Sequence, residues 1–357
     1  MMRPAQAQKK DFPIRLPKVL LLASSLLLIP LLVLLIPNTF IKKDLQAADP
    51  AVKTGYYIGN GRELSITGLG SKPDLVIIKS DTANAAAVFK TSVMPTNNMA
   101  YFSATVDNRD LRLRLDSDGF TVTENDQFRL DTDGFTLRNS ANINLPNIRY
   151  TWIAFFGSDC ESSTSVFCVG LYTGTNTSSQ SINIGFQPDF VMIKRDTNVA
   201  AHFKQTAMGS NTNTLWFTTT AVSTSGYINS LDATGFTVGT TDNLGGGTFY
   251  YVAFKESSSF FKQGTYTATG TDGLEITGLG FKPDFLIVKN ATNGTTANRN
   301  PLMNQRESYG NSSSYISSAT ANLVNAIKSL NSDGFTLGTS ALVNTSTDTF
   351  YYIAFGG

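Results

Sequence analysis

The stretch LGFKPDFLIVK, at residues 279–289, decides the fold of this chain because it occurs three times. The two earlier copies read LGSKPDLVIIK at 69–79 and IGFQPDFVMIK at 184–194. Each copy places a proline at the entrance of an apolar run, where its missing N–H does no harm to a strand. Residues 285–288 are apolar on both faces. The pattern therefore predicts a central β-strand, covered on both sides, in each of three repeated units.

Two further patterns recur around this strand. A Gly-x-Tyr segment opens each unit, and a strand rich in aromatic residues closes it. The opening segments are 55–57, 170–172 and 264–266, and the closing strands are 150–155, 249–254 and 350–355. A hairpin whose turn ends in glycine is predicted before the closing strand, as at 227–239 and 326–338. Alignment of the repeats favours a strand over the alternative helix at 317–327.

The length of the unit indicates its architecture. A repeat of roughly 95 residues with seven or eight short strands is typical of a β-sandwich, whereas a propeller blade has about 40–50 residues. The first unit is longer, because RLDSDGFTV at 114–122 returns as RLDTDGFTL at 129–137. We interpret this return as a tandem duplication of one hairpin strand. The sequence thus predicts an all-β chain of three tandem β-sandwich modules.

The amino-terminal part of the chain has a different composition. Residues 19–41 form a run of 23 uncharged residues between Lys18 and Lys42. As a helix this run is about 34 Å long, enough to cross a bilayer core of about 30 Å. The basic residues before it predict a cytoplasmic N-terminus, with the rest of the chain outside the cell. A single-pass anchor in the cell membrane is the first interpretation, and secretion after signal cleavage is the alternative.

These patterns predict a division of the chain. It consists of a basic cytoplasmic tail at 1–18, a transmembrane anchor or uncleaved signal at 19–41, a linker at 42–53, and β-sandwich modules at 54–158, 169–256 and 262–357. The formal net charge is +1 and charged residues make up 15% of the chain. This composition offers no basic surface for nucleic acid.

The cysteines and the histidine offer little chemistry. Cys160 and Cys168 are predicted to form a disulfide in an exported chain, with two unpaired thiols as the alternative. His202 is the sole histidine and lies far from both in sequence. Zinc needs further ligands, and a nucleophilic site needs a histidine in the right company. We therefore expect no catalytic residue, no cofactor and no metal.

An aspartate begins the repeated strand in each unit, and a lysine ends it. These residues are Asp74, Asp189 and Asp284, and Lys79, Lys194 and Lys289. Because no partner acid recurs with the aspartates, we interpret them as acceptors for backbone N–H groups at the turn into the strand. We interpret the lysines as side chains that reach solvent at the rim of the sandwich, with a ligand role as the alternative.

Two weaker candidates remain. The acidic turns at 116–119 and 131–134 begin like a calcium loop but lack the third acid and the glutamate of an EF-hand, so we interpret them as turns, with calcium binding as the alternative. Trp152 and Trp216 are candidate ligand-facing residues, because aromatic rings can stack on sugars. Aromatic residues on strands more often pack in the core.

The order GFxPDFVxIK, then DGFTLG, then YxAF resembles the repeat domains of phage tail appendages and related bacterial surface proteins. The resemblance covers roughly residues 55–355. It implies jelly-roll or lectin-like β-sandwiches with a role in adhesion or surface structure. The chain departs from it in its amino-terminal apolar segment and in Ser71, which stands where the other copies have phenylalanine. Both departures favour a cellular surface protein.

We therefore expect a membrane-anchored extracellular repeat protein that is not an enzyme. It acts as an adhesin or as a structural component of the cell envelope, with a cell-surface glycan or protein as its partner. Two alternatives are a glycan-processing enzyme on a lectin-like scaffold and a self-assembling filament or surface-layer subunit.

Overall fold

The computed structural model of the chain describes residues 50–357, except for 63, 83–84, 96–97, 104–113, 117–118, 122–133, 138–142, 219–221, 223–224, 293–300 and 306–309. Between 104 and 142 it describes only the backbone of three short strands. The predicted tail and membrane segment at 1–41 and residues 42–49 of the predicted linker lie outside the described residues. The linker was predicted to extend to residue 53, but residues 51–53 already belong to the first strand. None of the helices in the described part is long and apolar enough to cross a membrane.

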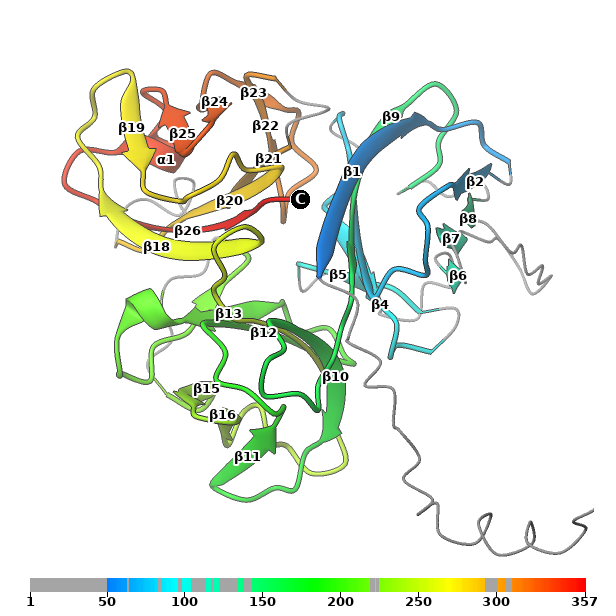
Figure 1. Cartoon of the computed structure of the whole chain (residues 1–357), viewed down its shortest axis with the longest axis vertical. Helices are drawn as coiled ribbons and strands as arrows, with labels where there is room; N and C mark the ends of the chain where they lie inside the picture. The colour runs from blue at the N-terminus through cyan, green and yellow to red at the C-terminus, as the bar shows by residue number, and fades with distance from the viewer. Residues whose placement is uncertain are drawn as a thin grey trace, which may run out of the picture. The chain divides into compact units, whose positions relative to one another are not determined.

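The described chain is nearly all β-structure, as predicted (Figure 1). The first unit contains β1 (Ala51–Ile58), β2 (Leu64–Thr67), β3 (Leu75–Ser80), β4 (Val88–Thr91), β5 (Ala100–Tyr101), β6 (Arg114–Asp116), β7 (Gly119–Thr121), β8 (Gly134–Leu137) and β9 (Arg149–Phe156). The second contains β10 (Phe167–Thr173), β11 (Ser179–Asn183), β12 (Phe190–Arg195), β13 (His202–Gln205), the 3-10 turn η1 (Thr206–Met208), β14 (Leu215–Trp216), β15 (Ile228–Asp232), β16 (Gly235–Gly239) and β17 (Thr248–Phe254). The third contains β18 (Phe261–Thr267), β19 (Leu274–Thr277), β20 (Phe285–Asn290), β21 (Leu302–Gln305), β22 (Ser312–Tyr315), β23 (Leu323–Val324), β24 (Ile327–Asn331), β25 (Gly334–Leu337), the one-turn helix α1 (Ala341–Asn344) and β26 (Thr349–Phe355).

One sheet order occurs in all three units. The larger sheets have the orders β1-β9-β3-β4-β5, β10-β17-β12-β13-β14 and β18-β26-β20-β21-β22-β23. In each, the closing strand lies between the opening strand and the repeated Pro-Asp strand, and both pairings are antiparallel. Smaller sheets have the orders β11-β16-β15 and β19-β25-β24. The predicted hairpins are β15–β16 and β24–β25, and the alternative helix at 317–327 is replaced by β23 and the start of β24.

Each unit encloses its own hydrophobic cluster. In the second unit, for example, Val191 and Ile193 of the larger sheet share a cluster with Phe236 and Val238 of the smaller sheet. The glycine of the Gly-x-Tyr segment packs against an aromatic ring of the closing strand. A Cβ atom on Gly170 would lie 2.1 Å from Tyr251 Oη. A Cβ atom on Gly55 or Gly264 would lie 2.5 Å from the side chain of Trp152 or Tyr352, so the motif requires glycine for close packing.

The second face of each larger sheet is covered by the other two units. One cluster combines buried residues from all three, among them Ile77, Met192 and Ile287 of the repeated strands. At its centre the rings of Phe155, Phe254 and Phe355 contact each other, with centroid separations of 4.8, 4.9 and 5.6 Å. The predicted strand covered on both sides is therefore confirmed, and its second covering is the shared core.

In the first unit, the two copies of the duplicated segment make two different pairings that a single strand, β16, makes in the second unit. The first copy forms the hairpin β6–β7, in which Asp116 is opposite Gly119 as Asp232 is opposite Gly235 in the second unit. The second copy, β8, pairs with β2 in the register that β16 keeps with β11, with Thr67 opposite Gly134. Both copies flank β2, in the order β6-β7-β2-β8.

Glutamine side chains connect neighbouring units in a cyclic order. Gln205 Nε2 of the second unit donates to Gly264 O of the third at 3.0 Å, and Gln305 Nε2 of the third donates to Gly55 O of the first at 3.1 Å. In the first unit the residue at the same register position is Thr91, and a continued cyclic order would place it opposite Gly170 of the second unit. The Thr91 hydroxyl is buried without a hydrogen-bond partner among the described residues.

The substitution Thr91→Gln is expected to stabilise the protein by about 0.5–1.5 kcal/mol, the usual net value of one added hydrogen bond. The longer amide reaches the Gly170 carbonyl as Gln205 and Gln305 reach theirs. Urea unfolding measures the change, and Gln205→Thr is the matched control, expected to destabilise. A loss of stability on Thr91→Gln would contradict the cyclic arrangement.

Candidate functional site

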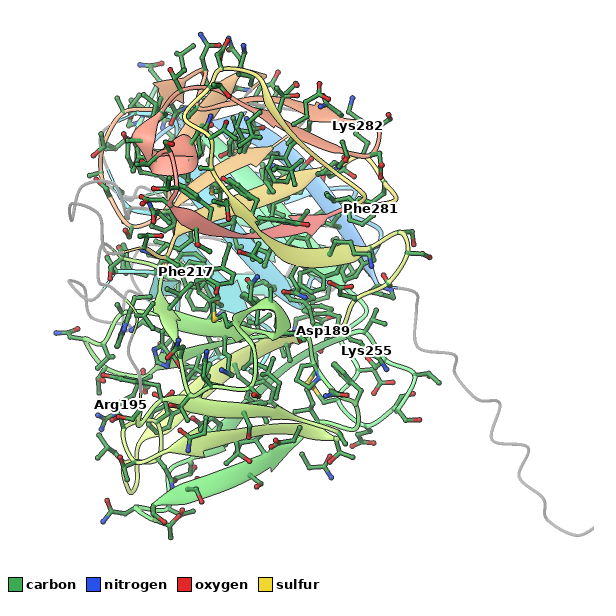
Figure 2. The ribbon with its side chains drawn as sticks, turned by 90° about the vertical axis from the view of Figure 1, so that its left-hand side faces the viewer. Asp189, Arg195, Phe217, Lys255, Phe281 and Lys282 are labelled. Carbon is green, nitrogen blue, oxygen red and sulfur yellow. A yellow bond between two sulfur atoms is a disulfide. The ribbon has the colours of Figure 1, made fainter. Side chains whose placement is uncertain are left out.

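The recurring aspartates hold the two ends of each unit together. Each accepts a backbone N–H from the second residue after the closing strand, at 2.8–2.9 Å. The pairs are Asp74 with Ser158, Asp189 with Glu256, and Asp284 with Gly357. Figure 2 shows Asp189 beside the segment at Lys255. The predicted role as an acceptor for backbone N–H groups is correct, but the donor lies at the far end of the unit and not in the turn. Burial raises the pKa of Asp74, which these hydrogen bonds only partly offset.

The prediction that the strand-ending lysines reach solvent at the rim is wrong. Lys79, Lys194 and Lys289 are at most 1% exposed. They lie on the face of the strand that enters the shared core, and each ammonium donates to backbone carbonyls. The acceptors include Ser80 O, Thr197 O and Thr218 O. Burial lowers the pKa of Lys79 and Lys194 to about 8. The sequence alone does not distinguish a strand-ending lysine whose ammonium group is exposed to solvent from one whose ammonium group is buried.

A second set of buried amines was not predicted. Lys90 Nζ donates to Pro95 O and Asn98 O, and Lys204 Nζ donates to Asn213 O. Burial lowers the pKa of Lys90 to about 7 and that of Lys204 to about 8. The third unit has Asn304 at this position, whose amide donates to Ser312 O at 2.9 Å. These groups bind and organise the loop after the strand.

The stability of the protein is expected to rise from about pH 7 to about pH 10. The pKa values of Lys79, Lys90, Lys194 and Lys204 are about 7–8 in the folded protein but about 10.4 in the unfolded chain. Between these values the unfolded state binds more protons than the folded state. The free energy of unfolding therefore increases with pH across this window. Above about pH 10 the sign reverses, because burial raises the pKa of Tyr57 and Tyr266 and the folded state then keeps more protons. Urea unfolding from pH 7 to 11 tests this, with Lys90→Met expected to reduce the slope. A free energy that falls between pH 7 and 9 would contradict it.

Each unit also contains a tyrosine–asparagine clamp that sequence reasoning missed. In the second unit Tyr172 Oη donates to Asp242 O at 2.8 Å, and the adjacent Asn243 accepts from Thr175 N at 2.7 Å and donates to Thr177 O at 2.9 Å. The equivalent pairs are Tyr57 with Asn144 and Tyr266 with Asn344. The sequence feature that could have predicted this clamp is an asparagine at the same distance before each closing strand.

The remaining sequence candidates lie in different places. Cys160 and Cys168 form a disulfide that fixes the start of the second unit. Trp216 packs in the interior against His202 and Tyr227, with ring centroids 4.9 Å away from each. His202 Nε2 and Asp242 Oδ2 are 2.7 Å apart and buried. The aspartate side chains of the acidic turns at 116–119 and 131–134 lie outside the described residues. Among the residues that the structure describes, no three His, Cys, Asp or Glu side chains form a cluster that could bind a metal ion.

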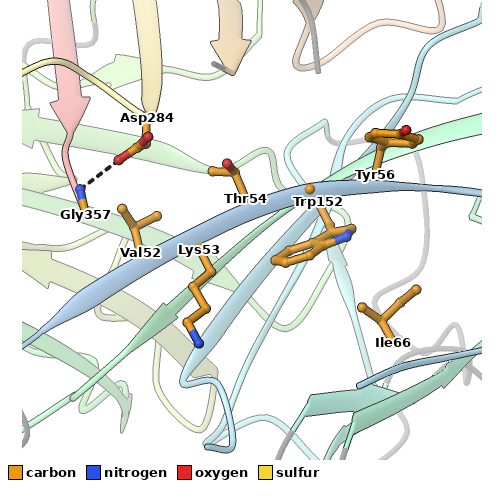
Figure 3. A pocket seen from close by; sticks show the side chains of 9 residues that line it. Val52, Lys53, Thr54, Tyr56, Ile66, Trp152, Asp284 and Gly357 are labelled. Carbon is orange, nitrogen blue, oxygen red and sulfur yellow. Dashed lines mark hydrogen bonds between the residues drawn. The ribbon is translucent and has the colours of Figure 1, made fainter. Parts of the chain in front are cut away.

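A cavity of about 530 Å³ opens where the first unit meets the third (Figure 3). It runs along β1 from Val52 to Tyr56. Trp152 and Ile66 line it on the side of the first unit, and Asp284 and Gly357 line it on the side of the third. Trp152, a predicted ligand-facing residue, is thus present in the cavity wall, although its ring is largely buried over Gly55.

The chemical groups of this cavity are mixed. Tyr56 is 56% exposed, and the Arg149 guanidinium lies 4.4 Å from the centre of its ring. Arg149 is itself held by Asp81 at 3.0 Å. The Lys53 ammonium donates to Leu69 O at 2.6 Å and points along the cavity wall. The lining offers an exposed tyrosine, one lysine and one aspartate, and the described lining residues contain no pair of a nucleophile and a base.

Comparison with known proteins matches two stretches of the chain. The family described as "Domain of unknown function (DUF7483)" matches residues 161–255 and again 256–356, which correspond to the second and third units. No curated protein matches the chain. Since the two matches together cover more than half of the sequence, the protein belongs to the DUF7483 family.

Proposed function

We propose that the protein is a membrane-anchored extracellular repeat protein that acts as an adhesin or as a structural component of the cell envelope. In this proposal each unit is a β-sandwich of the jelly-roll or lectin-like kind, comparable with the repeat domains of phage tail appendages. The proposal rests on one observation: the polar residues that recur in the units form structural hydrogen bonds with the backbone. The aspartates, the buried lysines and the tyrosine–asparagine clamps bind backbone groups in one unit after another.

The cavity supports binding better than catalysis. A glycan-processing enzyme needs two carboxyl groups roughly 5–10 Å apart across its groove. Asp284 supplies the one acidic side chain among the described lining residues, and its Oδ2 already accepts from Gly357 N. Elsewhere the buried polar groups that recur are engaged with the backbone. This favours a non-enzymatic role.

The filament alternative has less support. Exposed strand edges are the usual route to edge-to-edge assembly. Here the outer edges of β1 and β18 each receive a glutamine from the neighbouring unit, at Gly55 O and Gly264 O. Self-association through another surface remains part of the proposal, and electron microscopy of the purified protein separates it from a monomeric adhesin.

The test uses the full chain in lipid vesicles. Vesicles that carry it are expected to bind glycan arrays or partner cells, and external protease is expected to cleave the described units while the anchor stays in the membrane. Extraction of the chain by alkaline carbonate would contradict the anchor. Absence of both binding and assembly at high protein concentration would contradict the adhesive and structural roles together.

A further inference from the structure

The first unit is held in the shared core by contacts with both other units. Its Phe102 O accepts from Ala201 N of the second unit at 3.0 Å. Its Ala87 N donates to Ile316 O of the third unit at 2.7 Å. The three units thus form a closed ring around the shared core. The same contacts arise whether the first unit comes from the same chain or from a second copy of it, which is the condition for domain exchange.

The linker between the first and second units is longer than the next linker. It consists of ten residues, 157–166, between β9 and β10, whereas six residues, 255–260, connect β17 and β18. The longer linker contains a loop at 161–164 that is mostly exposed. The disulfide between Cys160 and Cys168 closes this loop at its base.

The disulfide shortens the path between the two units. With the bridge closed, three residues separate the end of β9 at Phe156 from Cys160, which is bonded to Cys168 within β10. The four Cα-to-Cα steps of this path reach at most about 14 Å. With the bridge open, the path runs over the whole linker to Phe167, and its eleven steps reach about 38 Å.

The width of a unit lies between these two lengths. A compact body of about 100 residues has a radius of gyration of about 13 Å, which corresponds to a diameter of roughly 34 Å. Only the open linker lets the first unit move aside by its own width and leave its place to the first unit of another chain. The linker at 255–260 reaches about 25 Å, so the same exchange is not expected of the third unit.

We propose that the Cys160–Cys168 disulfide is a redox lock that keeps the first unit in the ring of its own chain. When the disulfide is reduced, the first units of two copies exchange, and each completes the ring of the other. The partner is therefore a second copy of this chain. The inference goes beyond the proposed function and does not depend on adhesion.

A dithiol reductant opens the bridge from the solvent side. Cys160 is partly exposed and Cys168 is fully buried, so a thiolate of the reductant attacks Cys160 Sγ, and Cys168 leaves as a thiolate. The second thiol of the reductant then displaces Cys160. The two cysteines gain two electrons and two protons, and the reductant becomes a cyclic disulfide. The linker then has its full length.

The test measures the mass of the full chain in detergent micelles by size-exclusion chromatography with light scattering, after refolding from urea with and without dithiothreitol. A flexible linker gives the first unit an effective concentration of about 1 mM at its own ring, so at a chain concentration of about 0.1 mM roughly a tenth of the reduced chains are expected to be dimers. The oxidised chain is expected to be monomeric. Cys160→Ser combined with Cys168→Ser is expected to form the same dimers without reductant.

The matched control is the same double variant without residues 161–164. Its linker is as long as 255–260, and it is expected to remain monomeric. A further form of the double variant carries a protease recognition site within 161–164. Cutting there turns exchanged dimers into rings with the mass of one copy, because each ring is complete without the link. Dimers formed through any other surface, the amino-terminal segment included, persist after cutting.

Four outcomes would overturn the inference. They are monomers in both the reduced chain and the double variant, equal dimer fractions in the oxidised and reduced chains, dimers that survive cutting, and dimers of the control with the shorter linker. Circular dichroism establishes whether each chain is folded. A reduced chain that fails to fold would also contradict the lock, because exchange requires units that are stable without the bridge.

Discussion

Replacing Phe355 by alanine is expected to destabilise all three units together, by about 3–5 kcal/mol. The side chain is 1% exposed and its ring contacts both Phe155 of the first unit and Phe254 of the second. It also packs against Phe261 and Phe285 of its own unit. Truncation leaves a cavity at the point where the three larger sheets meet, and the surrounding strands can close it only in part.

The two tryptophans allow this prediction to be tested separately in the first and second units. Trp152 reports on the first unit and Trp216 on the second, and the third unit contains none. A substitution in the third unit that lowers the unfolding transition of both tryptophans must act through the shared core. Variants with a single tryptophan, Trp152→Phe and Trp216→Phe, allow each transition to be followed by fluorescence in urea.

The matched control is Phe350→Ala. Phe350 lies on the same strand but in the third unit's own cluster, where it stacks on Tyr266 at 5.2 Å. This variant removes the same side chain without touching the other units, so its effect on the two tryptophan transitions is expected to be smaller. If Phe355→Ala leaves both transitions where they are in the wild-type chain, the three units unfold independently and the shared core does not couple them.

The repeated strands were predictable, but their second covering was not. An apolar run such as 285–288 indicates that both faces of the strand are buried, but it does not indicate which part of the chain covers each face. The structure assigns one face to the unit's own cluster, which contains Leu286 and Val288, and the other to the shared core, which contains Phe285 and Ile287. Which unit packs on which depends on surface shape across hundreds of residues, and local patterns carry no record of it.

The candidate site was still less predictable. Trp152 was selected as an aromatic residue on a strand, and it does line the cavity, but the same reasoning selected Trp216, which is interior. The cavity is lined by residues of the first and the third unit, which are far apart in the sequence, so local patterns do not indicate it.

A buried histidine–aspartate pair in the second unit replaces an apolar pair in the other two. His202 aligns with Val88 and Leu302 through its pairing partners in the sheet, which are Trp216, Tyr101 and Tyr315. Asp242 aligns with Ile143 and Val343, because the carbonyl of each accepts the clamp tyrosine. The first unit thus packs Val88 with Ile143 in its cluster, and the third packs Leu302 with Val343.

Removing one member of this pair is therefore expected to cost far more than removing both. Asp242→Val leaves His202, fully buried, without the carboxylate 2.7 Å away, and a loss of about 3–5 kcal/mol is expected. The double substitution His202→Leu with Asp242→Val installs the third unit's apolar pair, and it is expected to be neutral or stabilising relative to wild type. Urea unfolding of the wild-type, two single and double variants gives the coupling free energy directly. Additive losses in the double variant would show that the pair is not interchangeable with its apolar counterparts, and that the second unit needs this histidine and aspartate for something other than packing.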